Sequence, residues 1–422
     1  MKLTIIGGGG VRTPLMVNGL IRWHERVNVD RLVLFDTDTE KLNVIGNLVS
    51  HLVQEKGSPF QVEVATDLRE AVKNADFIYT AIRVGGDVSR VVDEKIPLKY
   101  GVLGQETTGP GGFAMALRTI PVMLEYAKII EEVSPDAWVV NFTNPSGLIT
   151  EALQKYTNIK IVGICDAPSS MKLEIAKFLK EPADDVYIKY FGLNHLGWIN
   201  RIMVNGEDRL PDIIDRYDEF AKGFPHMSSF SKTFIQQLNM LPNEYLYYYY
   251  FREEAVQNIR QSSRTRGEQI VELNKSLLSQ VEDCIKKGQL QKALDIYEKI
   301  LSERTSSYMS NETGSAKSDE SVTLESEGYE GLAMSIIEGI LHNRRKTLVL
   351  NVPNQGVLSS LKDDDVVEVT CLLDSHGPVP LAVGQIPDRV QGLIHSVKEY
   401  ERLTVSAAVS GNYEQALLAL TV

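Results

Sequence analysis

The stretch MKLTIIGGGGVRT, residues 1–13, places a short apolar run directly before four consecutive glycines. Residues 3–6 are typical of a strand that is buried on both faces, and a helix is expected to begin near Thr13. Between them, Gly7–Gly10 form a turn whose backbone N–H groups can approach a pyrophosphate at the positive end of that helix. The strict spacing G-x-G-x-x-G would need a third glycine at Arg12, so a tight turn without a ligand is the alternative.

Further apolar runs follow within the first 165 residues, at 31–35, 77–81, 138–140 and 159–164. Amphipathic stretches separate these runs, and parallel strands need such crossovers. The alternation predicts an α/β fold that begins with a Rossmann-type parallel sheet domain over residues 1–165, as in lactate and malate dehydrogenases. Asp36 ends the second run and could bind the ribose hydroxyls of NAD, whereas Asp38 could simply cap the next helix.

The pattern of the chain changes after residue 185. Two antiparallel strands are expected at 186–191 and 198–204, and the chain is mostly helical from 210 to 302. Residues 305–327 are rich in Ser and Thr with little to bury, which predicts a mobile insertion. With two more strands expected at 347–352 and 366–373, residues 166–422 are predicted to form an α+β domain that binds substrate and metal.

Composition excludes several classes of partner. The 422 residues carry 44 Lys and Arg against 56 Asp and Glu, a net charge of −12 without a basic block, so no nucleic-acid partner is expected. No apolar run reaches the roughly 18 residues of a membrane span, and the first residues lack the apolar segment of a signal peptide. Three cysteines do not make a disulfide scaffold, so a cytoplasmic location is predicted.

Five longer peptides are more specific than the glycine turn. In chain order they are RVGGDVSRVVDEKIPLKYGVLGQETTGPGG from Arg83, NFTNPSG from Asn141, GICDAP from Gly163, FGLNHLGW from Phe191 and PNEYLYYYYF from Pro242. Together they resemble glycoside hydrolase family four, whose members are NAD- and metal-dependent enzymes acting on 6-phospho-glycosides and some galactosides. The resemblance spans nearly the whole chain except for the Ser- and Thr-rich insertion.

The resemblance implies hydrolysis outside the two-carboxylate scheme of most glycosidases. Carbon 3 of the sugar is oxidised by NAD⁺, a base removes the proton on carbon 2, and the aglycone leaves by elimination while a divalent metal, commonly Mn²⁺, stabilises the enediolate. Water then adds and the ketone is reduced again, so there is no net redox change. The implied substrate is a 6-phospho-glycoside, and family members are generally homodimers or homotetramers.

The resemblance assigns the metal to Cys165 and His195. Two protein ligands are too few for a closed zinc site, but they leave room for oxygens from a substrate. On the residues alone, Cys165 could be a small buried hydrophobe and His195 a satisfied core histidine. The implied base is Tyr245, with Tyr247 or Tyr248 next, and a tyrosine needs a nearby cation to act as a base near neutral pH. Simple aromatic packing is the alternative for this cluster.

The resemblance also assigns residues to cofactor and substrate. Those expected at the NAD are Gly7, Gly8, Gly9, Gly10, Val11, Arg12, Thr13, Asp36, Arg83 and Asn141. Those expected at the sugar or its phosphate are Arg90, Asn144, Arg266 and Glu106. Arginine suits a phosphate because its planar fork donates two hydrogen bonds, although either arginine could instead be a solvated surface charge.

Asp166, directly after Cys165, bears on the anomer that is cleaved. The family's 6-phospho-α-glucosidases have an aspartate here that can protonate the leaving oxygen, whereas many of its 6-phospho-β-glucosidases have asparagine. The peptides NFTNPSG and AVGQIP resemble the β branch more closely, so the sequence predicts a 6-phospho-β-glucosidase, with the α activity as the alternative. Asp166 could also simply cap the helix that begins near Pro168.

Three other functions remain as alternatives. A family member that acts on unphosphorylated sugars would not bind a 6-phosphate. An ordinary NAD-dependent dehydrogenase would need no metal and would produce NADH. A sensor would bind NAD or a sugar phosphate without turnover.

Overall fold

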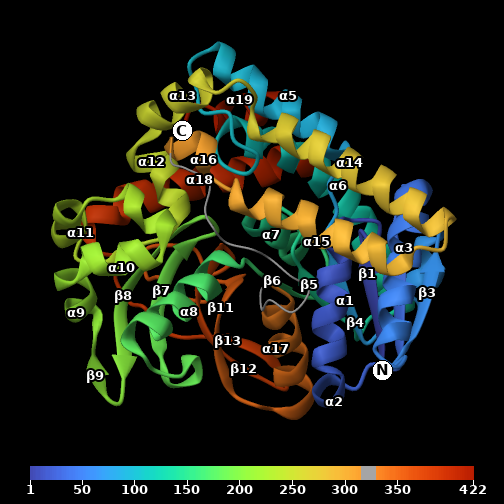
Figure 1. The fold of residues 1–422 in the computed structure, drawn as a ribbon. Helices are drawn as coiled ribbons and strands as arrows, with labels where there is room; N and C mark the ends of the chain where they lie inside the picture. Colours follow the sequence, from blue (N-terminus) through green and yellow to red (C-terminus); the bar gives the residue numbers. More distant parts are fainter. Residues whose placement is uncertain (315–328) are drawn as a thin grey trace.

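The computed structural model describes residues 1–314 and 329–422, and its centre is a nine-stranded sheet with helices on both faces (Figure 1). The strand order is β13-β12-β11-β6-β5-β4-β1-β2-β3. Six strands are parallel: β1 (Lys2–Ile6), β2 (Arg31–Phe35), β3 (Gln61–Ala65), β4 (Phe77–Thr80), β5 (Trp138–Asn141) and β6 (Lys160–Gly163). Their order, 3-2-1-4-5-6, is that of a dinucleotide-binding Rossmann sheet, so the predicted parallel α/β sheet is confirmed.

Helices form most of the remaining structure. In the first half of the chain they are α1 (Thr13–Arg22), α2 (His24–Val27), α3 (Thr39–Glu55), α4 (Leu68–Val72), α5 (Gly86–Lys99), α6 (Pro110–Val133), α7 (Ser146–Tyr156), α8 (Ala167–Leu179) and the 3₁₀ helix η1 (Ala183–Asp185). From residue 210 they are α9 (Leu210–Asp215), α10 (Tyr217–Gly223), η2 (Pro225–Ser229), α11 (Lys232–Leu238), η3 (Glu244–Leu246), α12 (Tyr247–Tyr250), α13 (Arg252–Gln261), α14 (Arg266–Lys286), α15 (Leu290–Ser306), α16 (Ser310–Thr313), α17 (Tyr329–His342), α18 (Asp388–Ser410) and α19 (Tyr413–Ala419). Within residues 1–314 and 329–422, no helix has the length and apolar character to span a bilayer.

The central strands are continuous apolar runs because helices cover both faces of the sheet. In β1, Leu3 and Ile5 belong to one buried core together with residues of α1 and α3. Ile6 points to the opposite face and packs with residues of α4 and α6. Because both faces are covered, even the polar Thr4 of β1 is buried, and its hydroxyl donates to the carbonyl of Ala71 at 2.8 Å.

Strand β3 is the parallel strand that the sequence analysis does not predict. It lies at the edge of the sheet beside β2, and its residues Gln61–Ala65 are exposed or only half-buried. Since the strand carries Gln61 and Glu63 among its few apolar residues, it lacks the continuous run that marks its neighbours.

The strands predicted near the C-terminus are present, as β11 (Lys346–Pro353) and β12 (Val366–Asp374), followed by β13 (Gly377–Pro380). They extend the Rossmann sheet, because β11 pairs antiparallel with β6 through Asn351 and Gly163. Strands from both sides of residue 165 therefore share one sheet, and the division into domains 1–165 and 166–422 stays a prediction.

A second, smaller sheet holds the predicted antiparallel pair, β7 (Tyr187–Leu193) and β8 (Leu196–Val204). Two short strands, β9 (Glu207–Asp208) and β10 (Leu241–Pro242), both pair with β8. Leu193 pairs with Leu196, so only Asn194 and His195 form the turn between β7 and β8. This tight turn fixes the position of His195.

The prediction of a mobile insertion at 305–327 is wrong for residues 305–314, which are largely helical and packed. Helix α15 continues to Ser306, and α16 packs on α13, where Asn258 donates a hydrogen bond to the carbonyl of Glu312 at 3.0 Å. The buried Met309 anchors this segment, which a count of Ser and Thr does not reveal. Residues 315–327 lie outside the described part of the chain.

Candidate active site

Most of the predicted site residues lie at the carboxyl edge of the parallel strands, where open α/β sheets bind ligands. The glycine turn follows β1, Asp36 follows β2, Arg83 lies beyond β4, and Cys165 lies two residues beyond β6. Helices α14 and α15 lie against α3 beside this edge (Figure 1). The structure thus gathers residues that are up to 160 positions apart in the chain.

The glycine turn is held tightly between β2 and β4. Gly7 has a positive φ of +96°, and a Cβ on it would lie 2.5 Å from the carbonyl oxygen of Ala81. A Cβ on Gly8 would lie 2.8 Å from the Cβ of Leu34. No side chain caps the first turn of α1, so its N-terminus is open to an anion. This geometry fits the pyrophosphate of a dinucleotide.

Asp36 fixes the other side of the turn. Its carboxylate accepts hydrogen bonds from the backbone N–H of Gly9 and of Asp38, each at 3.0 Å. Asp38 itself caps α3 by accepting from the N–H of Lys41 at 3.1 Å, as the sequence suggested. Asp36 is therefore the acid at the end of β2 that is positioned for a ribose.

Asn141 is arranged differently from what its assignment to NAD implies. It is completely buried; its Oδ1 accepts from the hydroxyl of Thr80 at 2.8 Å, and its Nδ2 donates to the hydroxyl of Thr150 at 3.2 Å. The side chain thus ties β4, β5 and α7 together and presents no unpaired amide. Asn144, on the loop after β5, is half-buried.

Arginines and carboxylates form a buried network beside the glycine turn. Arg83 and Arg90 both pair with Glu106, and Arg90 also donates to Glu94 at 2.7 Å. Burial alone would raise the pKa of Glu106, but Arg90 and Arg83 outweigh it and hold this pKa at about 2. At 6% exposure Arg90 is not the solvated surface charge that the sequence left open.

Arg266 joins this network from the start of α14. Its guanidinium donates to the hydroxyl of Ser307 at 2.7 Å and to the carbonyl of Arg304, and only 8% of the residue is exposed. Arg304, which the sequence analysis does not single out, has its pKa lowered to about 9 by burial and by the nearby Arg12. Arg90 and Arg266 also lower the pKa of Arg304. Arg12, Arg90 and Arg266 thus all lie near enough to Arg304 to lower its pKa, and a group of cations of this kind suits an anion.

Cys165 lies in an acidic environment. It is buried, and its Sγ lies 3.9 Å from Oδ1 of Asp166. Burial raises the pKa of the Cys165 thiol well above its usual value, and the carboxylates of Glu368 and Asp166 add to this. A bound divalent cation would reverse the effect, because a coordinating thiol is deprotonated.

His195 is 5% exposed, and burial lowers its pKa to about 4, so the imidazole is neutral. Its Nδ1 lies 3.0 Å from the hydroxyl of Thr107. One thiol and one neutral imidazole are donors that a divalent metal accepts. No group of three or more His, Cys, Asp or Glu placed to hold a metal occurs in residues 1–314 and 329–422.

Of the tyrosine cluster, Tyr245 is the member that contacts His195. The two rings are stacked, with centroids 3.7 Å apart and planes 3° from parallel. Tyr247 is buried, and its hydroxyl donates to Glu254 on α13 at 3.1 Å, which is a packing role. Burial, and then Asp166 and Cys165, raise the pKa of Tyr245 well above 10. Without a cation beside it, Tyr245 would be a poor base.

Asp166 occupies the N-cap position of α8, but its side chain accepts no capping hydrogen bond, so the helix-cap alternative is wrong. Burial raises the pKa of Asp166, although Arg12 opposes the shift. A raised pKa favours the protonated carboxyl that a proton donor needs.

The structure adds residues that the sequence analysis misses. Glu244 is buried beside Tyr245, its Oε2 has no hydrogen-bond partner among the described residues, and burial raises its pKa to about 8. Glu368 accepts from Asn194 at 3.0 Å, and burial raises its pKa to about 7. Tyr308 lies near Tyr245, and each of the two residues affects the pKa of the other. Glu244 stood within the quoted peptide PNEYLYYYYF, but nothing local marks Glu368 or Tyr308.

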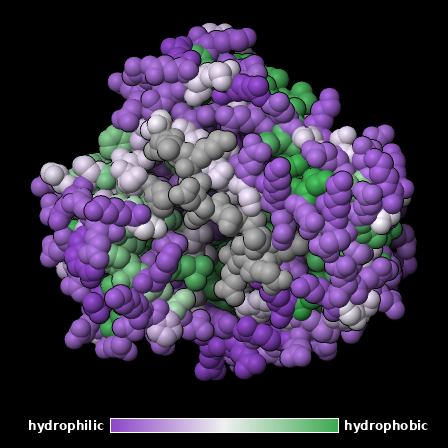
Figure 2. All heavy atoms as spheres, in the orientation of Figure 1, coloured by the Kyte–Doolittle hydropathy of each residue, from purple (hydrophilic) through white to green (hydrophobic). Residues whose placement is uncertain are grey.

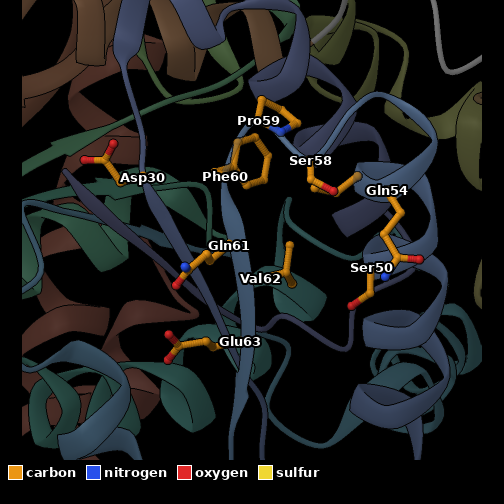
Figure 3. Close-up of a pocket in the computed structure, with 10 residues that line it drawn as sticks. Asp30, Ser50, Gln54, Ser58, Pro59, Phe60, Gln61, Val62 and Glu63 are labelled. Carbon is orange, nitrogen blue, oxygen red and sulfur yellow. The ribbon is translucent and has the colours of Figure 1, made fainter.

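A hollow of about 580 Å³ lies elsewhere, along the edge strand β3 (Figure 3). It is lined by residues such as Ser50, Gln54 and Gln61, at the amino end of β3. Because the glycine turn and Cys165 lie at the carboxyl ends of the strands, this hollow is separate from the candidate active site.

The strand order first defines a class: dehydrogenase-like α/β proteins with a Rossmann sheet. Malate dehydrogenase from Plasmodium falciparum shares this fold, with a TM-score of 0.56 at 15% identity over 100% of this chain and 99% of that one. The predicted dehydrogenase-like architecture is therefore confirmed. At 15% identity, this similarity shows the fold and not the family.

Two family models match the chain: "Family 4 glycosyl hydrolase" over residues 2–181 and "Family 4 glycosyl hydrolase C-terminal domain" over residues 190–422. The Bacillus subtilis protein named "Probable 6-phospho-beta-glucosidase" is 37% identical over 100% of this chain and 91% of its own length. The chain belongs to glycosyl hydrolase family 4, which confirms the resemblance seen in its sequence.

Solved structures of relatives cover the whole chain. The 6-phospho-β-glucosidase from Thermotoga maritima, solved with manganese, NAD⁺ and glucose-6-phosphate, is 31% identical with a TM-score of 0.83 over 100% of this chain and 93% of that one. A 6-phospho-α-glucosidase from gut microorganisms, solved with NAD and glucose-6-phosphate, is 29% identical with a TM-score of 0.86 over 100% and 92%. Both anomeric specificities thus occur on this fold.

Proposed function

We propose that the protein is a 6-phospho-β-glucosidase that depends on NAD and a divalent metal such as Mn²⁺. The observation that carries the proposal is the stack of Tyr245 on His195, beside the buried arginine network at the carboxyl edge of the sheet. The Bacillus subtilis and Thermotoga maritima relatives, both named 6-phospho-β-glucosidases, support the substrate class and the β anomer.

The glycine turn Gly7–Gly10, Val11–Thr13, Asp36 and Arg83 would hold NAD, and Cys165 with His195 would hold the metal. When bound, NAD supplies a hydride acceptor, and the metal supplies a Lewis acid that stabilises developing negative charge on the sugar. Because the side chain of Asn141 is fully paired within the protein, we assign it to holding the cofactor loops in place.

The protein's own groups would bind the sugar and move its protons. Arg90 and Arg266 would hold the 6-phosphate, with Glu106 fixing the orientation of Arg90. Tyr245 would remove the proton on carbon 2, and its stack on His195 holds it in place for that step. Asn144, on the loop after β5, would contact the sugar.

The α activity is the second candidate, and one observation favours it. Asp166 is buried next to Cys165 with a raised pKa and caps no helix, so it is suited to protonating a leaving oxygen. If the enzyme cleaves β-glucosides, Asp166 would not be essential for protonating the leaving oxygen and would be an accessory residue. The β relatives from Bacillus subtilis and Thermotoga maritima, at 37% and 31% identity, are more similar to this chain than the α relative at 29%, so the β activity is the first candidate.

The test is hydrolysis of nitrophenyl 6-phospho-β- and α-glucosides, with NAD⁺, Mn²⁺ and reductant each present or omitted. Turnover of the β substrate that disappears without NAD⁺ or Mn²⁺ supports the proposal. Preference for the α substrate overturns the anomer, and turnover of unphosphorylated glycosides overturns the substrate class. NAD binding without turnover of any glycoside would indicate a sensor.

We also propose that the protein acts in the cytoplasm as a homodimer or homotetramer. All three cysteines are free, and hydrophobic patches interrupt an otherwise hydrophilic face (Figure 2). Val88, Val92, Ile96 and Tyr100 are exposed at four-residue spacing, so they form a stripe along α5 and its C-cap. Since the opposite face of α5 carries Arg90, contact between subunits there would support the site. Sedimentation equilibrium of the unchanged protein and of Ile96→Glu tests this surface.

A further inference from the structure

The loop that follows α5 is packed unusually closely against the start of α6. A Cβ on Gly104 would lie 2.0 Å from the carbonyl oxygen of Glu94. Cβ atoms on Gly111 and Gly112 would lie 2.0 and 2.1 Å from the carbonyl oxygens of Gln105 and Thr107. These three glycines let backbone meet backbone, so the segment Gln105–Thr107 has a fixed position.

Within this loop, Gln105 organises its own neighbours. Its Oε1 accepts from the backbone N–H of Thr107 at 2.6 Å and from that of Thr108 at 2.7 Å. Because both partners are backbone donors, this atom must be the amide oxygen and not the nitrogen. Gln105 is buried, which protects the arrangement from water.

The orientation of the Thr107 hydroxyl follows from that oxygen. Its Oγ1 lies 3.1 Å from Oε1 of Gln105 and 3.0 Å from Nδ1 of His195. A hydroxyl has one proton, and an amide oxygen can only accept, so Thr107 donates to Gln105. Thr107 must then accept from His195, which places the ring proton on Nδ1 and leaves the lone pair of Nε2 available.

We propose that Gln105 and Thr107 are positioning residues that set the tautomer of His195, so that Nε2 is presented to the divalent metal. The inference rests on the proposed metal site at Cys165 and His195. The stack on Tyr245 fixes the plane of the imidazole, and the hydrogen bond to Thr107 fixes its rotation within that plane. The segment Gln105–Thr107 also carries Glu106, so one rigid loop would orient both the metal ligand and the arginines.

The first test measures Mn²⁺ affinity from the electron paramagnetic resonance signal of the free ion, in the full-length protein. Thr107→Val should weaken Mn²⁺ binding by about 10- to 100-fold, the usual effect of losing the partner of a metal-bound histidine. Thr107→Ser keeps the hydroxyl and should restore the affinity to within about threefold of the unchanged protein. Thr108→Val is the matched control, since it removes a neighbouring hydroxyl that makes no hydrogen bond to His195 within the described structure. NAD affinity, measured by fluorescence, should stay the same in all three variants.

Equal Mn²⁺ affinity in Thr107→Val and Thr108→Val would overturn the inference. The second test is independent of metal and of activity: ¹H–¹⁵N correlation spectra of the imidazoles in the metal-free protein, with His195 identified by its loss in His195→Gln. A proton on Nδ1 supports the inference, and a proton on Nε2 overturns it. Failure to hydrolyse 6-phospho-glycosides would contradict the proposed function without changing either result.

Discussion

Tyr245 and His195 act as one unit at the centre of the site. The phenol ring is stacked on the imidazole, with the ring centroids 3.7 Å apart, so each ring restricts the movement of the other. Burial, and then Asp166 and Cys165, keep Tyr245 protonated by raising its pKa. A divalent cation held by Cys165 and His195 would offset that negative environment, which links the base to the metal.

Replacement of Tyr245 by Phe should remove the phenol oxygen and little else, because the ring and its stack on His195 are retained. We expect kcat to fall by about 10²- to 10⁴-fold, the usual contribution of a general base, with NAD affinity unchanged. Tyr247→Phe is the control, since that hydroxyl contacts Glu254 on α13 and should leave kcat nearly unchanged. A Tyr245→Phe protein with full activity would remove Tyr245 from the mechanism.

Glu106 should make the stability of the protein depend on pH in the acid range. Its pKa is lowered from 4.5 to about 2 because Arg90 and Arg83 outweigh burial. The stabilisation is therefore fully present above the unfolded pKa of 4.5 and is lost as the pH falls towards 2. This shift means that the ionised Glu106 contributes on the order of 3 kcal/mol to the free energy of unfolding above its unfolded pKa.

The measurement is the urea midpoint of Glu106→Gln and of the unchanged protein between about pH 5 and pH 2. The unchanged protein should lose stability more steeply across this range. Glu219→Gln is a matched control, because Glu219 also pairs with an arginine, Arg216, but on the surface. The same pH dependence in all three proteins would contradict the prediction.

Site residues that lie in distinctive peptides could be named from the sequence, whereas their partners could not. Cys165, His195 and Tyr245 stand in such peptides, but whether they meet depends on how β6, the β7–β8 turn and η3 fold together. Glu368 lies in β12, about 200 residues after Cys165, and has no local signal. The cap rule suggested a role for Asp166 that the structure does not bear out, because burial beside Cys165 outweighs local preference.

Elements were predictable where both faces of a strand are buried. Strands β1, β2, β4, β5 and β6 were found as continuous apolar runs, while the half-exposed β3 was missed. Strands β11 and β12 were also found, but their pairing with β6 was not, because pairing partners distant in the chain leave no periodic pattern. The sheet is consequently larger than a domain limited to the first 165 residues.

Lys398 joins three of these elements and is completely buried. On α18, its amine pairs with Glu151 of α7 and with Glu401, and it donates to the carbonyl of Val366 in β12 at 2.7 Å. Lys398→Ala would remove the buried cation that pairs with Glu401 and would leave Glu151 with Lys155 as its remaining cation, so we expect a loss of about 3–5 kcal/mol in the free energy of unfolding. Urea unfolding followed by circular dichroism measures it.

Lys155→Ala provides the comparison at the same carboxylate. Lys155 also pairs with Glu151, at 2.9 Å, but its amine is partly exposed and water can replace it. Its loss should cost clearly less than that of Lys398. If both variants unfold at the same urea concentration, the buried Lys398 stabilises the protein no more than the partly exposed Lys155, and the prediction is wrong.

On the scale of the whole molecule, the group of arginines at the site stands out against the negative charge of the chain. The protein carries a net charge of −12, yet Arg12, Arg90 and Arg266 all lie near enough to Arg304 to lower its pKa. An anion would be repelled by the molecule at long range and bound strongly only inside it. This contrast favours a substrate that carries a phosphate over an uncharged glycoside.

The anomer is a property of the whole assembled site, and Asp166 offers the way to test it. If the protein cleaves β-glucosides with Asp166 as an accessory group, Asp166→Asn should keep hydrolysis of nitrophenyl 6-phospho-β-glucoside within about tenfold, because nitrophenolate leaves without a proton. Asparagine has nearly the same size and shape as the buried carboxyl beside Cys165 but cannot donate the acid proton, so the substitution tests that proton alone. A 6-phospho-α-glucoside with an alkyl aglycone needs that proton, and its hydrolysis should fall by about 100-fold or more if Asp166 is the acid. Such a loss, together with preference of the unchanged protein for the α anomer, would replace the β assignment with the α one.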